Sequence, residues 1–240
     1  PVEVGPLVAP ALLHINRVVV TSATLATGTS FDYSAREYGL HPAQLTRVLQ
    51  VESPFDFKNR TALYISKTAP MLDGSATAYD NMAAEIHELL DASRGGAFIL
   101  CASHNDLNNI YERLNATRRR YHLLRQPVDG GVEPVIAAIK SRPDVVVIGA
   151  KMLWEGVDVP GDALRLVILD KLPFSVPSDP LIAARCRALE EQGESPFMRY
   201  LVPAAALTLQ QGFGRLIRTQ RDRGVVAVLD GRVVQKGYGK

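Results

Sequence analysis

Short apolar runs alternate with helix-periodic segments along most of this chain, and this alternation restricts the possible folds more than any other feature. The runs AFILCA (97–102), DVVVIG (144–149) and GVVAVL (224–229) are apolar at nearly every position, as strands buried on both faces are. Between such runs the apolar residues recur at helical spacing, as they do over 77–92. The pattern predicts an α/β fold with a mainly parallel sheet that is covered by helices on both faces.

The remaining elements follow from the same periodicities. The expected strands are 18–20, 61–66, 97–102, 121–124, 144–149, 164–169 and 224–229. The expected helices are 31–40, 77–92, 107–114, 132–139, 179–192 and 196–217. The last helix contains Pro203, where we expect it to kink or split.

The first part of the chain differs from the rest, because its start is rich in proline and it contains one expected strand. We expect 1–48 to be the end of a preceding domain or an N-terminal extension, and 49–240 to form one domain. The chain opens on Pro1 with no initiator methionine, which indicates a piece of a larger protein.

Composition excludes several classes of protein. The net charge of +2 is too small for global attraction to nucleic acid, so any such contact must come from a local patch. Cys101 and Cys186 are the only cysteines and neither has a CxxC neighbour, which argues against a zinc or iron–sulfur site within the chain. The same cysteine usage favours a reducing, cytoplasmic setting. No apolar run reaches the roughly 18 residues needed to cross a bilayer.

The segment QGFGRLIR (211–218) carries the strongest functional signal. Arg215 and Arg218 are three residues apart, so on a helix they would share a face and offer two guanidiniums to phosphate oxygens. Gln211 could orient a water or a phosphate oxygen, and Gly214 would let a ligand approach the backbone. The alternative is a solvated helix end that happens to carry two arginines.

The loop WEGVDVPG (154–161) follows an apolar strand. Gly156 and Asp158 suit contact with a phosphate or a ribose, and Asp158 could also hold an arginine or a Mg²⁺-bound water. The alternative is a tight surface turn in which both residues serve only the turn.

Hydroxyl residues close two further expected strands. In TSATL (21–25), Ser22 and Thr24 could hydrogen-bond a phosphate backbone, although taken alone the segment is better explained as a strand that ends in an ordinary turn built by these hydroxyls. Ser103 follows the strand 97–102 and could also contact a nucleic-acid phosphate. We interpret the next residue, His104, as a helix-start or surface histidine.

Two motifs of a complete nucleoside triphosphatase do not occur in the sequence. There is no GxxxxGK[ST] loop to cradle phosphates, and no DExx box ends an apolar strand to hold Mg²⁺. The chain therefore contains arginines that could contact a nucleotide, but it lacks the loop that would bind the phosphates.

Taken in order, five segments resemble the second half of superfamily 2 helicases, and most nearly the DinG branch, which is related to XPD. The segments are TSATL (21–25), ILCASH (99–104), WEGVDVPG (154–161), KLPFSVPSDPL (171–181) and QGFGRLIR (211–218). The resemblance implies a RecA-like three-layer α/β/α domain. It also implies that ATP and Mg²⁺ are shared with a first RecA-like domain of the same protein, which carries the P-loop, the DExH box and, in many members, an iron–sulfur cluster.

The resemblance implies roles for the individual residues as well. Arg215 and Arg218 would reach the γ-phosphate with Gln211 beside it, and Gly214 would allow close approach. Gly156 and Asp158 would link the nucleotide site to the path of single-stranded DNA. Ser22 and Thr24 would couple hydrolysis to DNA movement in the 5′-to-3′ direction, and Ser103 would contact the strand backbone.

Two other functions remain open at this stage. The chain could be an ATP-independent nucleic-acid-binding or protein-docking module with a degenerate motor fold. It could also come from an RNA helicase or from a translocase that does not unwind. In every case we expect the isolated chain to show little or no ATP hydrolysis.

Overall fold

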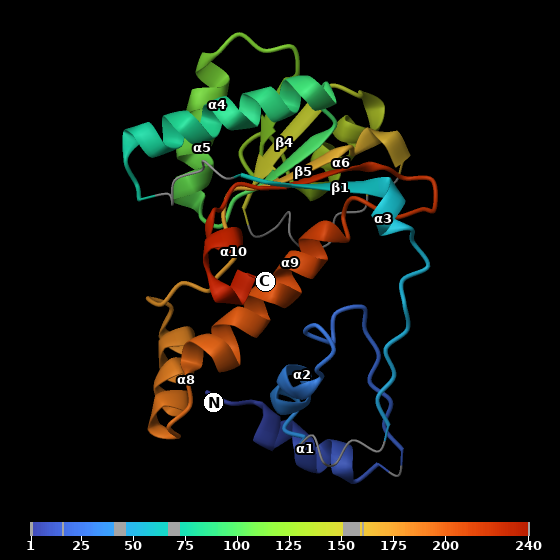
Figure 1. Ribbon diagram of the computed structural model, residues 1–240, viewed down its shortest axis with the longest axis vertical. Coiled ribbons are helices and arrows are strands. Elements are labelled where there is room, and N and C mark those ends of the chain that lie inside the picture. Colours follow the sequence, from blue (N-terminus) through green and yellow to red (C-terminus); the bar gives the residue numbers. More distant parts are fainter. Residues whose placement is uncertain are drawn as a thin grey trace. The chain divides into compact units, whose positions relative to one another are not determined.

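The computed structural model describes residues 2–15, 17–40, 47–66, 73–150, 159 and 161–239. The chain forms two compact units (Figure 1). The helical unit comprises Pro1–Glu52 and Phe174–Gln210, and the sheet unit comprises Ser53–Pro173 and Gln211–Lys240. Whether 1–48 belongs with a preceding domain stays a prediction.

The sheet unit is built on six parallel strands in the order β1-β6-β5-β2-β4-β3. The strands are β1 (Thr61–Ile65), β2 (Ala97–Leu100), β3 (His122–Arg125), β4 (Val145–Gly149), β5 (Leu166–Leu169) and β6 (Gly224–Val228). The four central strands β6, β5, β2 and β4 are rich in buried apolar residues, as is expected of a sheet that is covered on both faces. The predicted parallel α/β fold is confirmed.

The described helices of the sheet unit are α3 (Phe57–Arg60), α4 (Ala76–Ser93), α5 (His104–Ala116), α6 (Val132–Ser141) and α10 (Arg232–Gln235), with 3₁₀ turns at Gly161–Ala163 and Gly237–Gly239. The connections through α5 and α6 run in opposite directions along the sheet, so right-handed crossovers place these helices on opposite faces. The sheet unit is thus a three-layer α/β/α domain.

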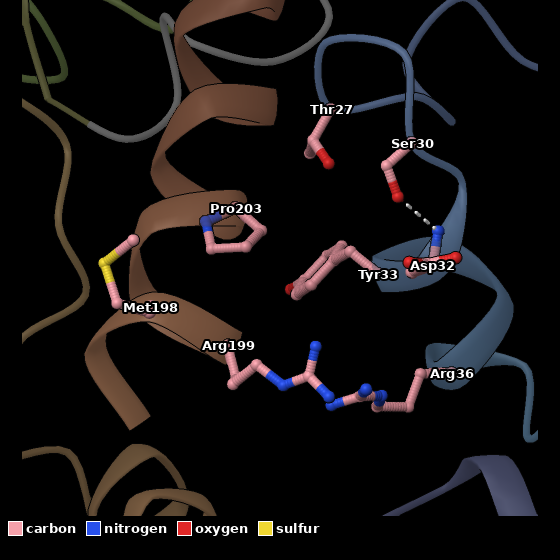
Figure 2. A pocket seen from close by; sticks show the side chains of 8 residues that line it. All are labelled: Thr27, Ser30, Asp32, Tyr33, Arg36, Met198, Arg199 and Pro203. Carbon is pink, nitrogen blue, oxygen red and sulfur yellow. Dashed lines mark hydrogen bonds between the residues drawn. The ribbon is translucent and has the colours of Figure 1, made fainter. Parts of the chain in front are cut away.

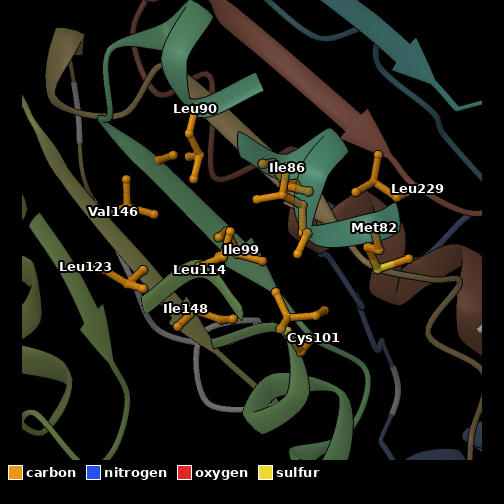
Figure 3. Close-up of a cluster of buried hydrophobic side chains, with 14 of the residues drawn as sticks. Met82, Ile86, Leu90, Ile99, Cys101, Leu114, Leu123, Val146, Ile148 and Leu229 are labelled. Carbon is orange, nitrogen blue, oxygen red and sulfur yellow. The ribbon is translucent and has the colours of Figure 1, made fainter. Parts of the chain in front are cut away.

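The core under α4 and α5 is a single cluster of apolar side chains (Figure 3). Ile86 and Leu90 of α4, Ile99 of β2 and Leu114 of α5 are fully buried there. Each such side chain contributes about 1.5–3 kcal/mol by leaving water. This packing holds the carboxyl ends of β2 and β5 in fixed positions.

The helical unit contains α1 (Gly5–Leu13), α2 (Asp32–Glu37), α8 (Pro180–Glu191), a π-helical turn (Phe197–Leu201) and α9 (Val202–Phe213) as far as Gln210. The predicted helix over 196–217 is split: a π-helical turn runs to Leu201, and Pro203 lies in the first turn of α9, where its missing N–H is tolerated. Within this unit Arg185 of α8 donates to the carbonyl of Val2 at 3.0 Å and to the hydroxyl of Tyr200 at 3.2 Å. These bonds tie the start of the chain to the helices 180–213.

The strand predicted over 18–20 is wrong for this chain. Val18, Val19 and Val20 are 42, 87 and 39% exposed and lie outside any strand. Their branched side chains favour extended backbone, but a strand also needs a hydrogen-bonding partner, and no described strand pairs with this segment.

Candidate functional site

The QGFGRLIR segment leaves the helix earlier than its spacing predicts. Helix α9 ends at Phe213, and Gly214 to Leu216 form a turn in which Arg215 N–H bonds to the carbonyl of Gly212 at 3.1 Å. Arg215 and Arg218 therefore do not share a helix face, contrary to the sequence prediction. Two glycines within four residues weaken the helix, and burial of Leu216 and Ile217 stabilises the alternative path.

The carboxylate of Asp222 fixes the backbone around Arg218. It accepts hydrogen bonds from the main-chain N–H groups of Arg218 and Thr219, each at 2.8 Å, and from the Thr219 hydroxyl at 2.6 Å. Burial alone would raise the pKa of Asp222, but these bonds lower it below its usual value. The Arg218 residue itself is exposed, on a backbone that these bonds fix.

Gly224 joins this turn to the sheet. A Cβ atom at this position would lie 2.4 Å from the carbonyl oxygen of Arg165 and 2.5 Å from Cδ1 of Leu216. Any larger residue would push β6 away from β5 or displace Leu216. Residues 214–222, which carry Arg215 and Arg218, are called the arginine turn below. The glycine at the start of β6 therefore sets how closely this turn packs against the sheet.

At the carboxyl end of β2, Ser103 caps helix α5. Its hydroxyl accepts the N–H of Asp106 at 3.1 Å and donates to the Asp106 carboxylate at 2.5 Å. A hydroxyl has one hydrogen, and here it goes to Asp106, so it is not available to a phosphate in this conformation. The strand contact expected of Ser103 would require that bond to break.

Asp106 is the centre of a buried polar group that we call the carboxyl-edge cluster: Tyr79, Ser103, Asp106, Asp170 and Lys171. The Asp106 carboxylate accepts the Tyr79 hydroxyl at 2.7 Å and the Lys171 ammonium at 2.5 Å. Burial works to raise the pKa of Asp106, but the donors Lys171, Ser103 and Tyr79 lower it overall. Lys171 is thus held beside the start of α5 with part of its side chain exposed.

Asp170 ties the ends of β5 and β2 together. One of its oxygens accepts the N–H groups of Ala102 at 2.9 Å and Lys171 at 2.7 Å. Its other oxygen is buried and has no hydrogen-bond partner among the described residues. Burial, together with the nearby charge of Asp106, raises the pKa of Asp170 to about 8.

Asp230 repeats this arrangement at the end of β6. Its carboxylate accepts the N–H of Leu172 at 2.8 Å and pairs with the Arg232 guanidinium at 2.7 Å. Acidic residues at the ends of β5 and β6 therefore brace the KLPF segment from two strands.

The other predicted site residues fall into three groups. In the helical unit, the hydroxyls of Ser22 and Thr24 lie 3.3 Å apart and Thr24 N–H bonds to Ser22 Oγ at 3.2 Å, which is a local turn with an exposed Ser22. Gly156 and Asp158 lie outside the described residues. Gln211 is exposed in the last turn of α9, and Gly214 begins the turn that follows.

Sequence reasoning missed the carboxylates that organise this edge. Asp170 and Asp230 each come directly after an apolar strand, in LVILD and VVAVLD, and Asp106 stands three residues after a capping serine. Those spacings were visible signals. No group of three or more metal-ligating side chains occurs within the described ranges, and none of the helices described there is long and apolar enough to cross a membrane.

The profile of the helicase C-terminal domain family matches residues 86–240, which contain β2 to β6, the carboxyl-edge cluster apart from Tyr79, and the arginine turn. The chain belongs to the helicase C-terminal domain family. Together with the DinG and YoaA relatives and the XPD structures described next, this match confirms the resemblance to the DinG and XPD branch.

Several proteins are similar in sequence to this helicase C-terminal domain. It is 35% identical over 221 residues to the ATP-dependent DNA helicase YoaA of Escherichia coli, covering 92% of this chain and 34% of that protein. It is 38% identical over 246 residues to the ATP-dependent helicase DinG of Mycobacterium tuberculosis, covering 100% and 36%. It is also 33% identical over 246 residues to the 3′-5′ exonuclease DinG of Bacillus subtilis, covering 100% and 26%. The chain thus spans about a third or less of these relatives.

Solved structures of XPD share the fold. One XPD helicase matches with a TM-score of 0.69 at 18% identity, covering 91% of this chain and 39% of that one. Xpd4 of S. tokodaii matches with a TM-score of 0.55 at 17% identity, covering 73% and 35%. The expected RecA-like architecture is confirmed by these likenesses.

Proposed function

We propose that this chain is the second motor domain of an ATP-dependent DNA helicase and that it acts together with a first motor domain of the same protein. The observation that carries the proposal is the exposed Arg218 on a backbone fixed by Asp222, in a chain of the helicase C-terminal domain family. The chain has no P-loop sequence, and the first domain would supply it.

The donors of the arginine turn fit a triphosphate. Two guanidiniums provide planar N–H forks that match phosphate oxygens. Bound ATP with Mg²⁺ would supply the γ-phosphoryl group that is transferred to water, with ADP as the leaving group. Arg215 and Arg218 would stabilise the charge that develops during transfer, and Gln211 would orient a phosphate oxygen or the attacking water. Arginines in such roles raise rates by roughly 10³- to 10⁵-fold.

Single-stranded DNA would be the second ligand, bound through its phosphates without regard to sequence. Ser22 and Thr24 would contact it from the helical unit, and Gly156 and Asp158 would link it to the nucleotide. On the sheet unit the contact proposed for Ser103 has a second donor beside it, because the Lys171 ammonium shares the carboxylate of Asp106. Loss of the γ-phosphate would release the arginines. The contacts with the DNA strand would then change, and the protein would move along the strand in the 5′-to-3′ direction.

The experiment compares the full-length protein with the 240-residue chain. We expect full-length protein to hydrolyse ATP when single-stranded DNA is added. The chain alone should bind single-stranded DNA in a salt-dependent way but release no phosphate. ATP turnover by the purified chain would contradict the proposed division of labour. ATP hydrolysis that is stimulated by RNA and not by DNA would indicate an RNA helicase. Absence of ATP hydrolysis from both preparations would favour a binding module.

A further inference from the structure

The helical unit contains a polar pocket that the roles above do not use (Figure 2). Its volume is about 130 Å³. It is lined by Thr27, Ser30, Asp32, Tyr33, Arg36, Met198, Arg199 and Pro203, all of which belong to the helical unit. The pocket joins α2 to the π-helical turn and the start of α9.

Two arginines form one side of the pocket. Figure 2 shows the guanidiniums of Arg36 and Arg199 next to each other, although they come from segments more than 150 residues apart. Glu194 holds both: its carboxylate is 3.1 Å from Arg36 Nη1 and 2.9 Å from Arg199 Nε. One carboxylate balances one of the two charges, and Arg199 Nη1 has no hydrogen bond to any described residue.

The charge of the pocket limits what it can bind. Asp32 also lines the wall but forms no ion pair with either arginine in the part of the chain described. With Glu194 and Asp32 against two arginines, the site is close to neutral. Such a site suits the single charge of a phosphodiester better than the several charges of a free triphosphate.

Neutral donors lie across from the arginines. The main chains of Thr27 and Ser30 pair with each other at 2.9 and 3.1 Å, which fixes a tight turn with both hydroxyls at the pocket. Ser30 Oγ accepts the N–H of Asp32 at 3.1 Å and keeps its own hydrogen for another acceptor. Burial raises the pKa of Tyr33, so its phenol is a neutral donor at the same wall.

We propose that this pocket binds a backbone phosphate of single-stranded DNA, with Arg36 and Arg199 as charged donors and Thr27 and Ser30 as neutral donors. Thr27 follows Thr24 by three residues, so the two positions are at most about 11 Å apart. A strand that touches TSATL can therefore reach the pocket within a few nucleotides. The inference rests on the proposed function and adds a strand contact that the QGFGRLIR segment does not provide.

The test is the salt dependence of single-stranded DNA binding by the full-length protein, measured with a fluorescent oligothymidine. Removing one phosphate contact lowers the slope of log affinity against log salt by about 0.7. We expect this reduction for R36Q/R199Q. We expect the native slope for R36K/R199K, which keeps both charges, and for R187Q, which removes an exposed arginine of α8 that does not line the pocket.

Each other outcome overturns the inference. An unchanged slope in R36Q/R199Q, with DNA binding by the native protein intact, removes the pocket from the DNA path and leaves the proposed function standing. If R36Q/R199Q binds DNA more weakly and R36K/R199K binds it equally weakly, the two arginines only stabilise the structure around Glu194. Loss of ATP binding with an unchanged DNA slope makes the pocket a nucleotide site. No DNA binding by native protein defeats both proposals.

Discussion

The carboxylate of Asp222 accepts the main-chain N–H of Arg218 at 2.8 Å, and this bond fixes the backbone from which the Arg218 guanidinium extends. The same carboxylate holds Thr219 through its N–H and its hydroxyl. The turn is thus organised around a buried acid placed four residues beyond the arginine. Arg218 is positioned by that acid and not by helix periodicity.

Replacing Asp222 with alanine should destabilise the chain by about 1–3 kcal/mol, because two main-chain N–H groups lose their acceptor. Urea unfolding of the chain measures this effect. Thr219→Val is the matched control: it removes one hydroxyl, keeps the two main-chain bonds and should cost less. Equal costs for the two variants would show that the main-chain bonds contribute little.

The pair of Asp106 and Lys171 should show strong coupling. Lys171→Met leaves the Asp106 carboxylate buried without its cation, which we expect to cost about 3 kcal/mol. Asp106→Asn removes the charge that needs compensation, so the double variant should be more stable than Lys171→Met alone. A double-mutant cycle by chemical denaturation tests this. Additive losses would mean that the two side chains do not depend on each other.

Asp170 should make stability depend on pH in the opposite direction from an ordinary paired carboxylate. Its pKa is raised to about 8, so from about pH 4 to pH 8 the folded chain keeps a proton that the unfolded chain has lost. Stability from this group therefore falls as pH rises through that window. Asp170→Asn carries no such proton, so its Tm relative to native protein should increase between pH 5 and pH 8. A constant difference in Tm would contradict the assignment.

Ser103 has a structural role that can be separated from DNA contact. Ser103→Ala removes the cap of α5 and should cost about 1 kcal/mol, whereas Ser103→Thr keeps a hydroxyl at the cap and should cost less. If the hydroxyl serves only Asp106, alanine will leave the salt slope of single-stranded DNA binding unchanged. A reduced slope in Ser103→Ala would show that the hydroxyl leaves Asp106 to bind a phosphate.

Much of the fold could be predicted because each central strand is apolar on both faces and each intervening helix repeats its apolar residues at helical spacing. Those signals are local, and β2, β4 and α4 follow them closely. The strand predicted at Val18–Val20 was wrong because pairing is not local: β-branched residues cannot form a strand without a partner. The end of α9 at Phe213 was missed because Asp222, beyond the helix, draws the chain into a turn.

The candidate site was predictable in its residue types but less so in its geometry. The arginines and the capping serine stand out in the sequence, and so do the acidic residues that follow the apolar strands, but the sequence does not show which side chains these acidic residues contact. Asp106, Asp170 and Lys171 meet only because β2 and β5 pair in parallel and end at the same edge. The pocket at Arg36 and Arg199 joins segments more than 150 residues apart, which no spacing rule connects.

The central claim is that Arg218 acts on a nucleotide held with another domain. The most direct measurement is single-stranded-DNA-stimulated ATP hydrolysis by full-length Arg218→Ala, with ATP binding measured on the same preparation. Arg221→Ala, an exposed arginine of the same turn, is the control. We predict that Arg218→Ala loses roughly 10³-fold or more in kcat while ATP still binds, and that Arg221→Ala stays close to native. Native hydrolysis by Arg218→Ala would contradict the account and make the turn a structural element.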